Sequence, residues 1–379
     1  MTSILHPLRI GKHIVQYPIV QGAMAVGVSG AKLAGAVANA GGVGVIASLG
    51  LGLHSPDFHQ RKRNSFFAAN RLALIDELTK ARNISPDGVM AVNILVATKD
   101  YPVLAQTAAA QGANLIITGA GVPVCLPEYT ADYPDVALVP SVSNLFSAQL
   151  ICQTWQRQYN RLPDALIVEN CQQVGGHFSQ CEDVNSPGFS IESVIFQLRQ
   201  YCEEQLGVKI PLIVAGGIGD RTDIDKMLAV GADGVQIGTR FITTEECDAH
   251  RRYKDYHLQA SAADIVTVPS PVGKPSRALR NSFAEQAMTH SSTTLERRCI
   301  ANCLETCLCR DTGKTYCLLQ ALSKAALGDV EHGLIFSGAN VGYTDRIMSV
   351  TELMAELTQP QKPMHSNIVV QRKNPLQIN

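Results

Sequence analysis

Residues 211–241 read PLIVAGGIGDRTDIDKMLAVGADGVQIGTRF. Two short apolar runs, Pro211–Ala215 and Gly234–Gly238, lack polar alternation, as is typical of strands that are covered on both faces. The residues between them, Thr222–Val230, have helical spacing and end at Gly231, a common helix terminator. The stretch therefore predicts one strand–helix–strand unit of a parallel sheet.

The same alternation of strand and helix continues toward the N-terminus. Six further apolar runs read as strands: Tyr17–Gln21, Val43–Ala47, Val89–Leu95, Leu115–Thr118, Ala137–Val142 and Ala165–Asn170. Helical spacing separates them at Gly30–Ala40, Arg71–Arg82, Val103–Gln111, Leu145–Tyr159 and Ile191–Gln205. Eight such units predict an α/β protein with a (β/α)8 TIM barrel. The competing fold, a doubly wound open sheet, typically has G-x-G-x-x-G in its first turn, where this chain has Gly22-Ala23-Met24.

The chain after the eighth strand predicts a different organisation. We expect the barrel to occupy residues 1–242. A smaller, mostly helical and cysteine-rich domain, inserted after strand eight over the barrel mouth, would occupy residues 243–336. Residues 337–358 would return to the barrel and supply its closing helix, because a capping-box pattern begins at Ser349. Residues 359–379 are expected to form a loosely ordered tail.

Composition excludes several classes of protein. The chain has 379 residues, of which 46% are hydrophobic and 17% charged, and its formal net charge is −1. The near-zero net charge indicates no basic surface for nucleic acid or anionic lipid. The high hydrophobic content excludes an intrinsically disordered chain. No secretory h-region is visible, and the longest apolar run, Gly41–Leu53, is too short to cross a bilayer. We therefore expect a cytoplasmic enzyme without nucleic-acid or membrane partners, and a homo-oligomer remains open.

Two glycine-rich strand ends carry the strongest chemical signal. Strand seven ends in Ala215–Gly219, and strand eight ends in Gln236–Arg240. In (β/α)8 barrels the loops after these two strands often bind phosphate through backbone N–H groups, which glycine lets approach closely. Thr239 would add a hydroxyl, and Arg240 a charge if it faces the site. The alternative is that these glycines only form tight turns.

A histidine follows strand six at the end where barrels keep their catalytic residues. The polar run 169–174 leads into Gly175-Gly176-His177. An imidazole titrates near neutral pH, so His177 is a candidate general acid or base at the mouth. The alternative is a histidine on a surface loop.

The glycine-rich strand ends and the Gly-Gly-His run belong to a larger set of motifs along the chain. They are Pro18–Met24, Asn39–Gly44, Gly175–His177, Ala215–Ile218 and Gly231–Phe241. Together they resemble the nitronate monooxygenase family, formerly called 2-nitropropane dioxygenase, which includes FMN-dependent enoyl-ACP reductases. The resemblance covers about residues 8–247 and extends more weakly to Leu357.

This resemblance implies an FMN whose ring lies at the barrel mouth and whose phosphate lies in the glycine-rich cup. It makes His177 the catalytic residue, placed to remove the proton α to a nitro group or to handle protons on an enoyl substrate. We expect no metal ligand among the site residues. The cofactor-binding residues that the resemblance implies are Ala23, Met24, Asn93, Asn170, Gly175, Gly216, Gly217, Gln236, Gly238 and Thr239. Asn170 stands where many members have glutamine, and Val174 where alanine is usual.

Three functions follow from these features. The first is oxidation of alkyl nitronates by FMN with dioxygen. The second is an NAD(P)H-dependent FMN reductase acting on an enoyl thioester or a quinone. The third lies outside redox chemistry, since a barrel with a phosphate cup also suits an isomerase or lyase of a sugar or nucleotide phosphate. The sequence leaves the physiological substrate open.

Eleven cysteines in a chain of this size are expected to be reduced thiols. Five of them are close in sequence: Cys299, Cys303, Cys307, Cys309 and Cys317. On a helix the first three would share one face. The group would then serve helix packing, bind zinc or an iron–sulfur cluster, or form a redox pair.

Overall fold

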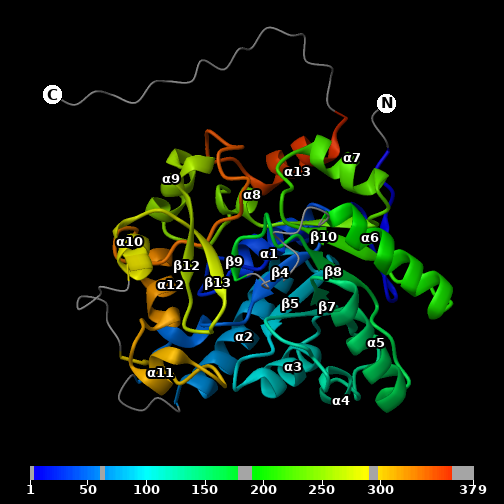
Figure 1. Cartoon of the computed structure of the whole chain (residues 1–379), viewed down its shortest axis with the longest axis horizontal. Coiled ribbons are helices and arrows are strands. Elements are labelled where there is room, and N and C mark those ends of the chain that lie inside the picture. Colours follow the sequence, from blue (N-terminus) through cyan, green and yellow to red (C-terminus); the bar gives the residue numbers. More distant parts are fainter. Residues whose placement is uncertain (1–3, 60–64, 178–189, 290–297, 361–379) are drawn as a thin grey trace, which may run out of the picture.

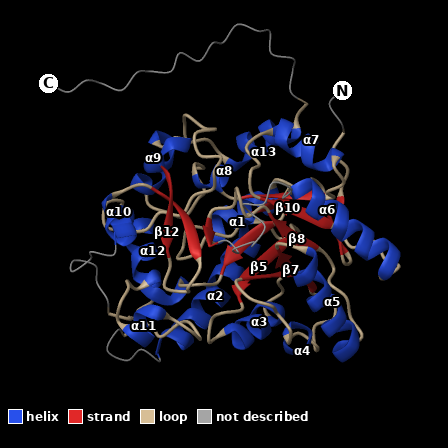
Figure 2. Cartoon of the chain, in the orientation of Figure 1, coloured by secondary structure: helices blue, strands red, loops and turns tan. Residues whose placement is uncertain are grey.

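The computed structural model describes residues 4–59, 65–177, 190–289 and 298–360. A parallel sheet of eight strands lies at its centre, with helices around it (Figures 1 and 2). In chain order the strands are β3 (Ile19–Gln21), β4 (Gly44–Ala47), β5 (Met90–Leu95), β6 (Leu115–Gly119), β7 (Ala137–Val142), β8 (Leu166–Glu169), β10 (Leu212–Ala215) and β11 (Gly234–Ile237). A parallel bridge between Val20 and Val43 brings β3 beside β4, so the ring is nearly closed. The expectation of a TIM-barrel-like α/β fold is confirmed.

The helices of the barrel cover the outside of this ring. They are α1 (Ala31–Asn39), α2 (Ser65–Ile84), α3 (Tyr101–Ala110), α4 (Leu126–Tyr129), α5 (Leu145–Tyr159), α6 (Ile191–Gln200), α7 (Arg221–Ala229) and α8 (Thr239–Ile242). Short 3-10 or π turns lie at Leu51–His54, Tyr201–Gln205 and Ala262–Asp264.

Both faces of the barrel strands are buried, as their continuous apolar runs require. Val45, Ile117 and Ile167 pack inside the barrel. A hairpin of β1 (Leu8–Ile10) and β2 (His13–Val15) adds apolar side chains to this interior cluster. The sequence analysis did not find this hairpin, because its two strands are only three residues long.

The chain after β11 forms a layer beside the barrel mouth. Its elements are α9 (Arg251–Gln259), β12 (Ile265–Pro269), β13 (Pro275–Leu279), α10 (Ser282–Thr289), α11 (Leu308–Thr312) and α12 (Leu318–Ala326). The expectation of a mostly helical segment missed an antiparallel sheet here, in the order β12-β13-β9, where β9 is Gly176–His177. Figure 1 shows β12 and β13 as a yellow-green hairpin beside β9.

A last helix, α13 (Val350–Thr358), returns to the barrel. It begins with a capping box, as its sequence predicts: Glu352 N donates to Ser349 Oγ at 3.2 Å, and Ser349 N donates to Glu352 Oε2 at 2.8 Å. The helix packs against α1, α7 and α8. The predicted tail lies, from residue 361, outside the described residues. Within the described ranges, no helix has the length and apolar character that crossing a membrane requires.

Candidate active site

A cavity of about 570 Å³ lies at the carboxyl ends of the barrel strands. One wall comes from strand ends, and the other comes from the turn between β12 and β13, from α12 and from residues 334–340. A second cavity, of about 1190 Å³, lies around Arg9 and Lys209, and none of the predicted site residues lines it. The first cavity is therefore the candidate site.

The structure brings nearly all the predicted site residues to this cavity. Those that line it are Ala23, Met24, Asn93, Gly175, Gly216, Gly217, Gln236, Gly238, Thr239 and His177. Asn170 is the exception, since its Oδ1 accepts a hydrogen bond from Gln172 N at 3.2 Å and it does not line the cavity. Alternate residues of a strand face opposite sides, so Glu169 faces inward like Ile167. Glu169, rather than Asn170, therefore lines the cavity.

The upper edge of the barrel interior is polar. Asn93 lies two residues beyond Ala91, Ser141 beyond Val139 and Glu169 beyond Ile167, and all three apolar residues pack inside the barrel. Asn93, Ser141, Glu169 and Gln236 line the cavity. A ring of hydrogen-bonding groups over an apolar core suits a flat, polar ring system.

The loops after β10 and β11 form a cup. Gly217 has a φ of +82°, which L side chains rarely adopt. A Cβ on Gly238 would meet no protein atom within 4 Å, so this backbone faces open space. The N–H groups of both glycines donate to no acceptor among the described residues. Unused backbone donors beside open space fit an anionic group such as a phosphate.

A further segment completes the cup and was missed by the sequence analysis. Gly338 N donates to Thr239 Oγ1 at 3.0 Å. A Cβ on Gly175 would lie 2.6 Å from Gly338 N, so the loop after β8 packs directly on this segment. Ser337 and Asn340 also line the cavity. Only the fold joins residues 337–340 to the strand ends, because they lie about a hundred residues later in the chain.

Arg240 does not contribute a positive charge to the cup. Its side chain is buried, donates to the carbonyl of Gly219 and forms an ion pair with Glu356 of α13 at 2.9 Å. It does not line the cavity. The residue stands on the side of α8 that faces the closing helix, so it ties α13 to the barrel.

His177 is held from several sides. It pairs with Ser276 across the β9–β13 ladder, and its Nε2 lies 2.6 Å from Ser270 Oγ. Its ring contacts Phe336 edge-on, with centroids 5.2 Å apart. Among the described residues, Ser270 is the hydrogen-bond partner of the ring. These contacts fix the orientation of an imidazole that lines the cavity.

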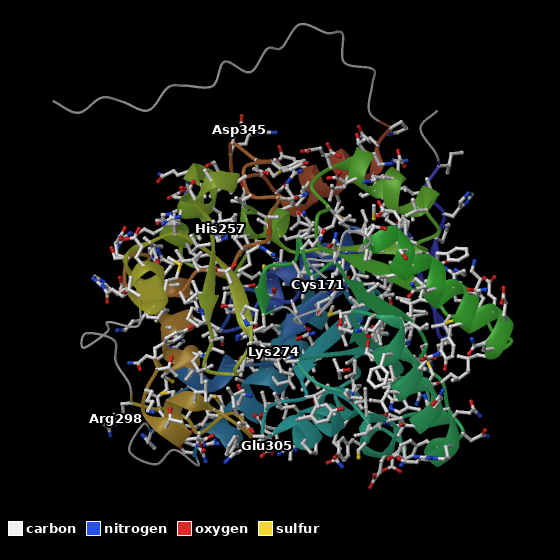
Figure 3. The ribbon with its side chains drawn as sticks, in the orientation of Figure 1. Cys171, His257, Lys274, Arg298, Glu305 and Asp345 are labelled. Carbon is white, nitrogen blue, oxygen red and sulfur yellow. The ribbon has the colours of Figure 1, made fainter. Side chains whose placement is uncertain are left out.

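Burial sets the protonation of the cavity. Burial, and then the positive charge of Lys274, lower the pKa of His177 to about 4, so its imidazole is neutral at physiological pH. Burial raises the pKa of Glu169 to about 7, with Lys274 acting in the opposite direction. Figure 3 labels Lys274 beside the β12–β13 hairpin, near the centre of the view. The cavity thus holds a neutral base, a cation and a carboxyl group that is partly protonated.

Three of these residues were missed by the sequence analysis. The inward alternation of β8 was a usable signal for Glu169, since it stands two residues beyond Ile167. Ser270 and Lys274 lie in the turn between β12 and β13, about a hundred residues from His177, and no local pattern marks them.

The cysteine cluster does not lie on one helix. Cys299, Cys303 and Cys307 precede α11 in irregular chain, and the expectation of a shared helix face is wrong. With Cys309 and Cys317 they pack in one apolar cluster. Among the described residues, no group of three or more His, Cys, Asp or Glu side chains could hold a metal ion.

The expectation of reduced thiols fails at one described position. Cys171 is disulfide-bonded, whereas the other described cysteines are not. This cysteine follows Asn170 directly after β8, in the loop that leads to His177.

A nearly closed parallel barrel, with its cavity at the carboxyl ends of the strands, is the arrangement of a TIM-barrel enzyme. Comparison with known families then gives the particular group. The model of the nitronate monooxygenase family matches residues 6–360, so the chain belongs to this family of oxidoreductases.

Individual relatives agree with this assignment. A probable nitronate monooxygenase of Staphylococcus saprophyticus is 27% identical over 292 residues, covering 71% of this chain and 77% of that protein. FabK from Thermotoga maritima has a similar fold, with a TM-score of 0.67, 24% identity and coverage of 90% of this chain and 92% of that chain. A nitroalkane oxidase from Streptomyces ansochromogenes has a TM-score of 0.65, 20% identity and coverage of 90% and 95%. At these identities, the two structural likenesses concern the fold.

Proposed function

We propose that the protein binds FMN and oxidises alkyl nitronates with dioxygen. The observation that carries the proposal is a fixed, neutral imidazole, that of His177, in the same cavity as a cup of unused backbone donors. FMN would accept two electrons from the substrate and pass them on to dioxygen.

The residues present suit this cofactor. The N–H groups of Gly217 and Gly238, with the hydroxyl of Thr239, would hold the phosphate. Asn93 and Gln236 would hydrogen-bond the ring edge, because both belong to the polar edge of the barrel. Ala23 and Met24 would lie against the ring, and Gly175 and Gly216 beside the ribityl chain. Asn170, which the resemblance also implied, has no part in this arrangement.

His177 would act as a base when the neutral nitroalkane is the substrate. With its Nε2–H donating to Ser270 Oγ, the lone pair of Nδ1 is left to accept the α-proton. Lys274 adds a positive charge to the same cavity. A cation beside the base favours the nitronate anion that proton removal forms. The low pKa of His177 keeps its imidazole unprotonated at neutral pH, so it is available as a base there and has no proton to give as an acid.

Two assays on the purified holoenzyme test the proposal. Oxygen uptake with an alkyl nitronate, without a nicotinamide, is the expected activity. Anaerobic mixing with NAD(P)H measures flavin bleaching. Rapid bleaching by NAD(P)H without any nitronate turnover would overturn the proposal in favour of a reductase of an enoyl thioester or quinone. A colourless protein that binds no FMN would instead favour an isomerase or lyase of a phosphorylated substrate.

A further inference from the structure

We infer that Cys309 and Cys317 form an oxidisable dithiol pair behind the residues that line the active-site cavity. Cys309 lies on α11, and Cys317 is the residue before α12. The Cys309 thiol donates a hydrogen bond to the Cys317 sulfur, so the two sulfur atoms are in contact. Both residues are buried, with exposed fractions of 2% and 6%. This inference does not depend on the proposed function.

The surroundings of Cys317 distinguish it from a cysteine that only fills space. Cys317 is the N-cap residue of the nine-residue helix α12. The Cys309 thiol first, and then the backbone amides of Gln320, Ile300 and Leu319, lower the pKa of Cys317, although burial opposes them. A neutral apolar side chain gains nothing from three amide donors, whereas a thiolate does. Burial and neighbouring sulfur atoms raise the pKa of Cys303 in the same cluster. Because the N-terminus of a helix favours a thiolate, we assign Cys317 as the nucleophile of the pair.

The reaction needs a small oxidant, and hydrogen peroxide is the class that fits a nearly sealed pair. The Cys317 thiolate attacks one peroxide oxygen, the O–O bond breaks, and the leaving hydroxide takes a proton to become water. The sulfur is then a sulfenic acid. The Cys309 sulfur attacks it, the S–O bond breaks, and the released oxygen and the Cys309 proton leave as a second water. Two thiols and one peroxide give one disulfide and two waters.

The position of the pair gives the bond a structural effect. Residues 304–306, which precede Cys309, line the cavity, and so do Leu318 and Leu322 of α12. A disulfide would tie these two parts of the wall together. Thr98 and Leu304 form a bridge, so the same wall is also attached to the chain after β5. The bond would thus join a segment held by the barrel to the first turn of α12.

Peroxide treatment of the full-length holoenzyme, followed by peptide mapping with mass spectrometry, tests the inference. We expect the loss of two thiols per chain, a crosslink between Cys309 and Cys317, and full reversal by dithiothreitol. Both thiols remaining unmodified, or a crosslink between other members of the cluster, would overturn it. Stoichiometric zinc or iron in the purified protein would overturn it as well, because the sulfur atoms would then be metal ligands.

Variants separate the two roles. Cys309→Ser should leave a sulfenic acid at Cys317 that dimedone traps, and Cys317→Ser should react with peroxide at least about tenfold more slowly at position 309. Cys303→Ser, in the same buried cluster, is the matched control and should form the crosslink as the wild type does. Trapping at 309 in Cys317→Ser at the wild-type rate would overturn the assignment. If a variant fails to fold, the wild-type crosslink map still decides.

Discussion

Three neighbours determine what the imidazole of His177 can do. Ser270 fixes one nitrogen, Phe336 packs on the ring, and Lys274 disfavours the protonated form. An unperturbed histidine titrates near pH 6.5, so it would be partly protonated in a mildly acidic cell. Here the imidazole stays unprotonated far below that pH and is available to accept a proton, although the same low pKa makes it a weaker base than an unperturbed histidine.

The first prediction concerns this base. His177→Asn should keep FMN, because the cup is separate from the ring, and should lose turnover of neutral nitroalkanes by a factor of about 10²–10⁴. The wild-type kcat/KM for a neutral nitroalkane should fall only as pH drops through about 4, where the imidazole gains its proton. Preformed nitronate serves as the control substrate, since it needs no base. Full nitroalkane turnover in the variant would contradict the assignment.

The second prediction concerns the carboxyl group of Glu169, whose pKa burial raises to about 7. Binding of FMN would enclose it further and favour its neutral form, so binding takes up a proton. FMN affinity should therefore weaken as pH rises past about 7, by up to about tenfold per unit. Fluorescence titration of the apoprotein measures this.

Glu169→Gln should remove the decrease of FMN affinity above about pH 7 and leave only the pH dependence that comes from titration of the FMN phosphate. Glu305→Gln is the matched control, because Glu305 also lines the cavity but is exposed. The same slope in the wild type and in Glu169→Gln would contradict the prediction.

At this scale the sequence singled out His177, the proposed base, but not its neighbours. His177 stands out because two glycines precede it at a strand end. Ser270 and Lys274 approach it only because β13 pairs with β9, and such pairing of distant segments leaves no local pattern. Asn170 was chosen on family position, whereas the two-residue period of β8 turns Glu169 inward.

Among the elements, the eight barrel strands were the most predictable. Each lies within its expected range or within one residue of it, because runs such as Leu212–Ala215 must be apolar on both faces. The cysteine segment was not predictable from its four-residue spacing. Asn302 adopts a φ of +53°, which interrupts a helix. Lys99 N donates to Cys303 O at 3.0 Å, so this segment is hydrogen-bonded to the chain after β5 and does not form a helix.

The third prediction belongs to the loop after β11. Gly238→Val should lower FMN affinity by about 1–3 kcal/mol, because the side chain would occupy the open space of the cup. The thermal stability of the apoprotein should not change, since no protein atom lies within 4 Å of the new Cβ. Calorimetric titration and thermal unfolding measure the two effects.

Gly216→Val provides the contrast. Gly216 has a φ of +94°, and a Cβ there would lie 2.7 Å from Val174 Cγ1, so the apoprotein itself should be destabilised. Unchanged FMN affinity in Gly238→Val would contradict the location of the cup.

Over the whole molecule, part of the layer after β11 shares an apolar core with the barrel, while Val268 and Phe283 belong to a cluster of their own. Tyr253 and Val330, which follow the barrel, belong to the same cluster as the outer faces of the strands. Figure 2 shows helices of both parts around the central strands. We therefore expect the molecule to unfold as one unit, so that a buried group in the mouth layer affects its overall stability.

The fourth prediction tests this through His257 of α9. Burial lowers its pKa to about 4, while the unfolded chain takes up a proton near pH 6.5. Above pH 6.5 the imidazole is neutral in both the folded and the unfolded protein, so this group does not change the free energy of unfolding. As pH falls from 6.5 to 4, the free energy of unfolding should decrease by up to about 3 kcal/mol from this group. Urea unfolding across this pH range measures it.

His257→Phe should reduce that slope, because it keeps the ring and removes the titration. His6→Gln is the control and should leave the slope unchanged, because His6 is exposed and forms no ion pair among the described residues. Equal slopes in the wild type and in His257→Phe would show that other groups dominate acid unfolding.

The position of α13 in the chain has a consequence for synthesis. Every barrel strand has left the ribosome once residue 237 has emerged, yet the helix that packs on α1, α7 and α8 is encoded only at residues 350–358. Leu353 and Leu357, both fully buried in the finished protein, are thus among the last core side chains to be translated. A nascent chain must carry the apolar surfaces of α1 and α7 uncovered while more than a hundred further residues are added. During that interval it is a natural client for chaperones, and premature termination before α13 should yield an insoluble barrel.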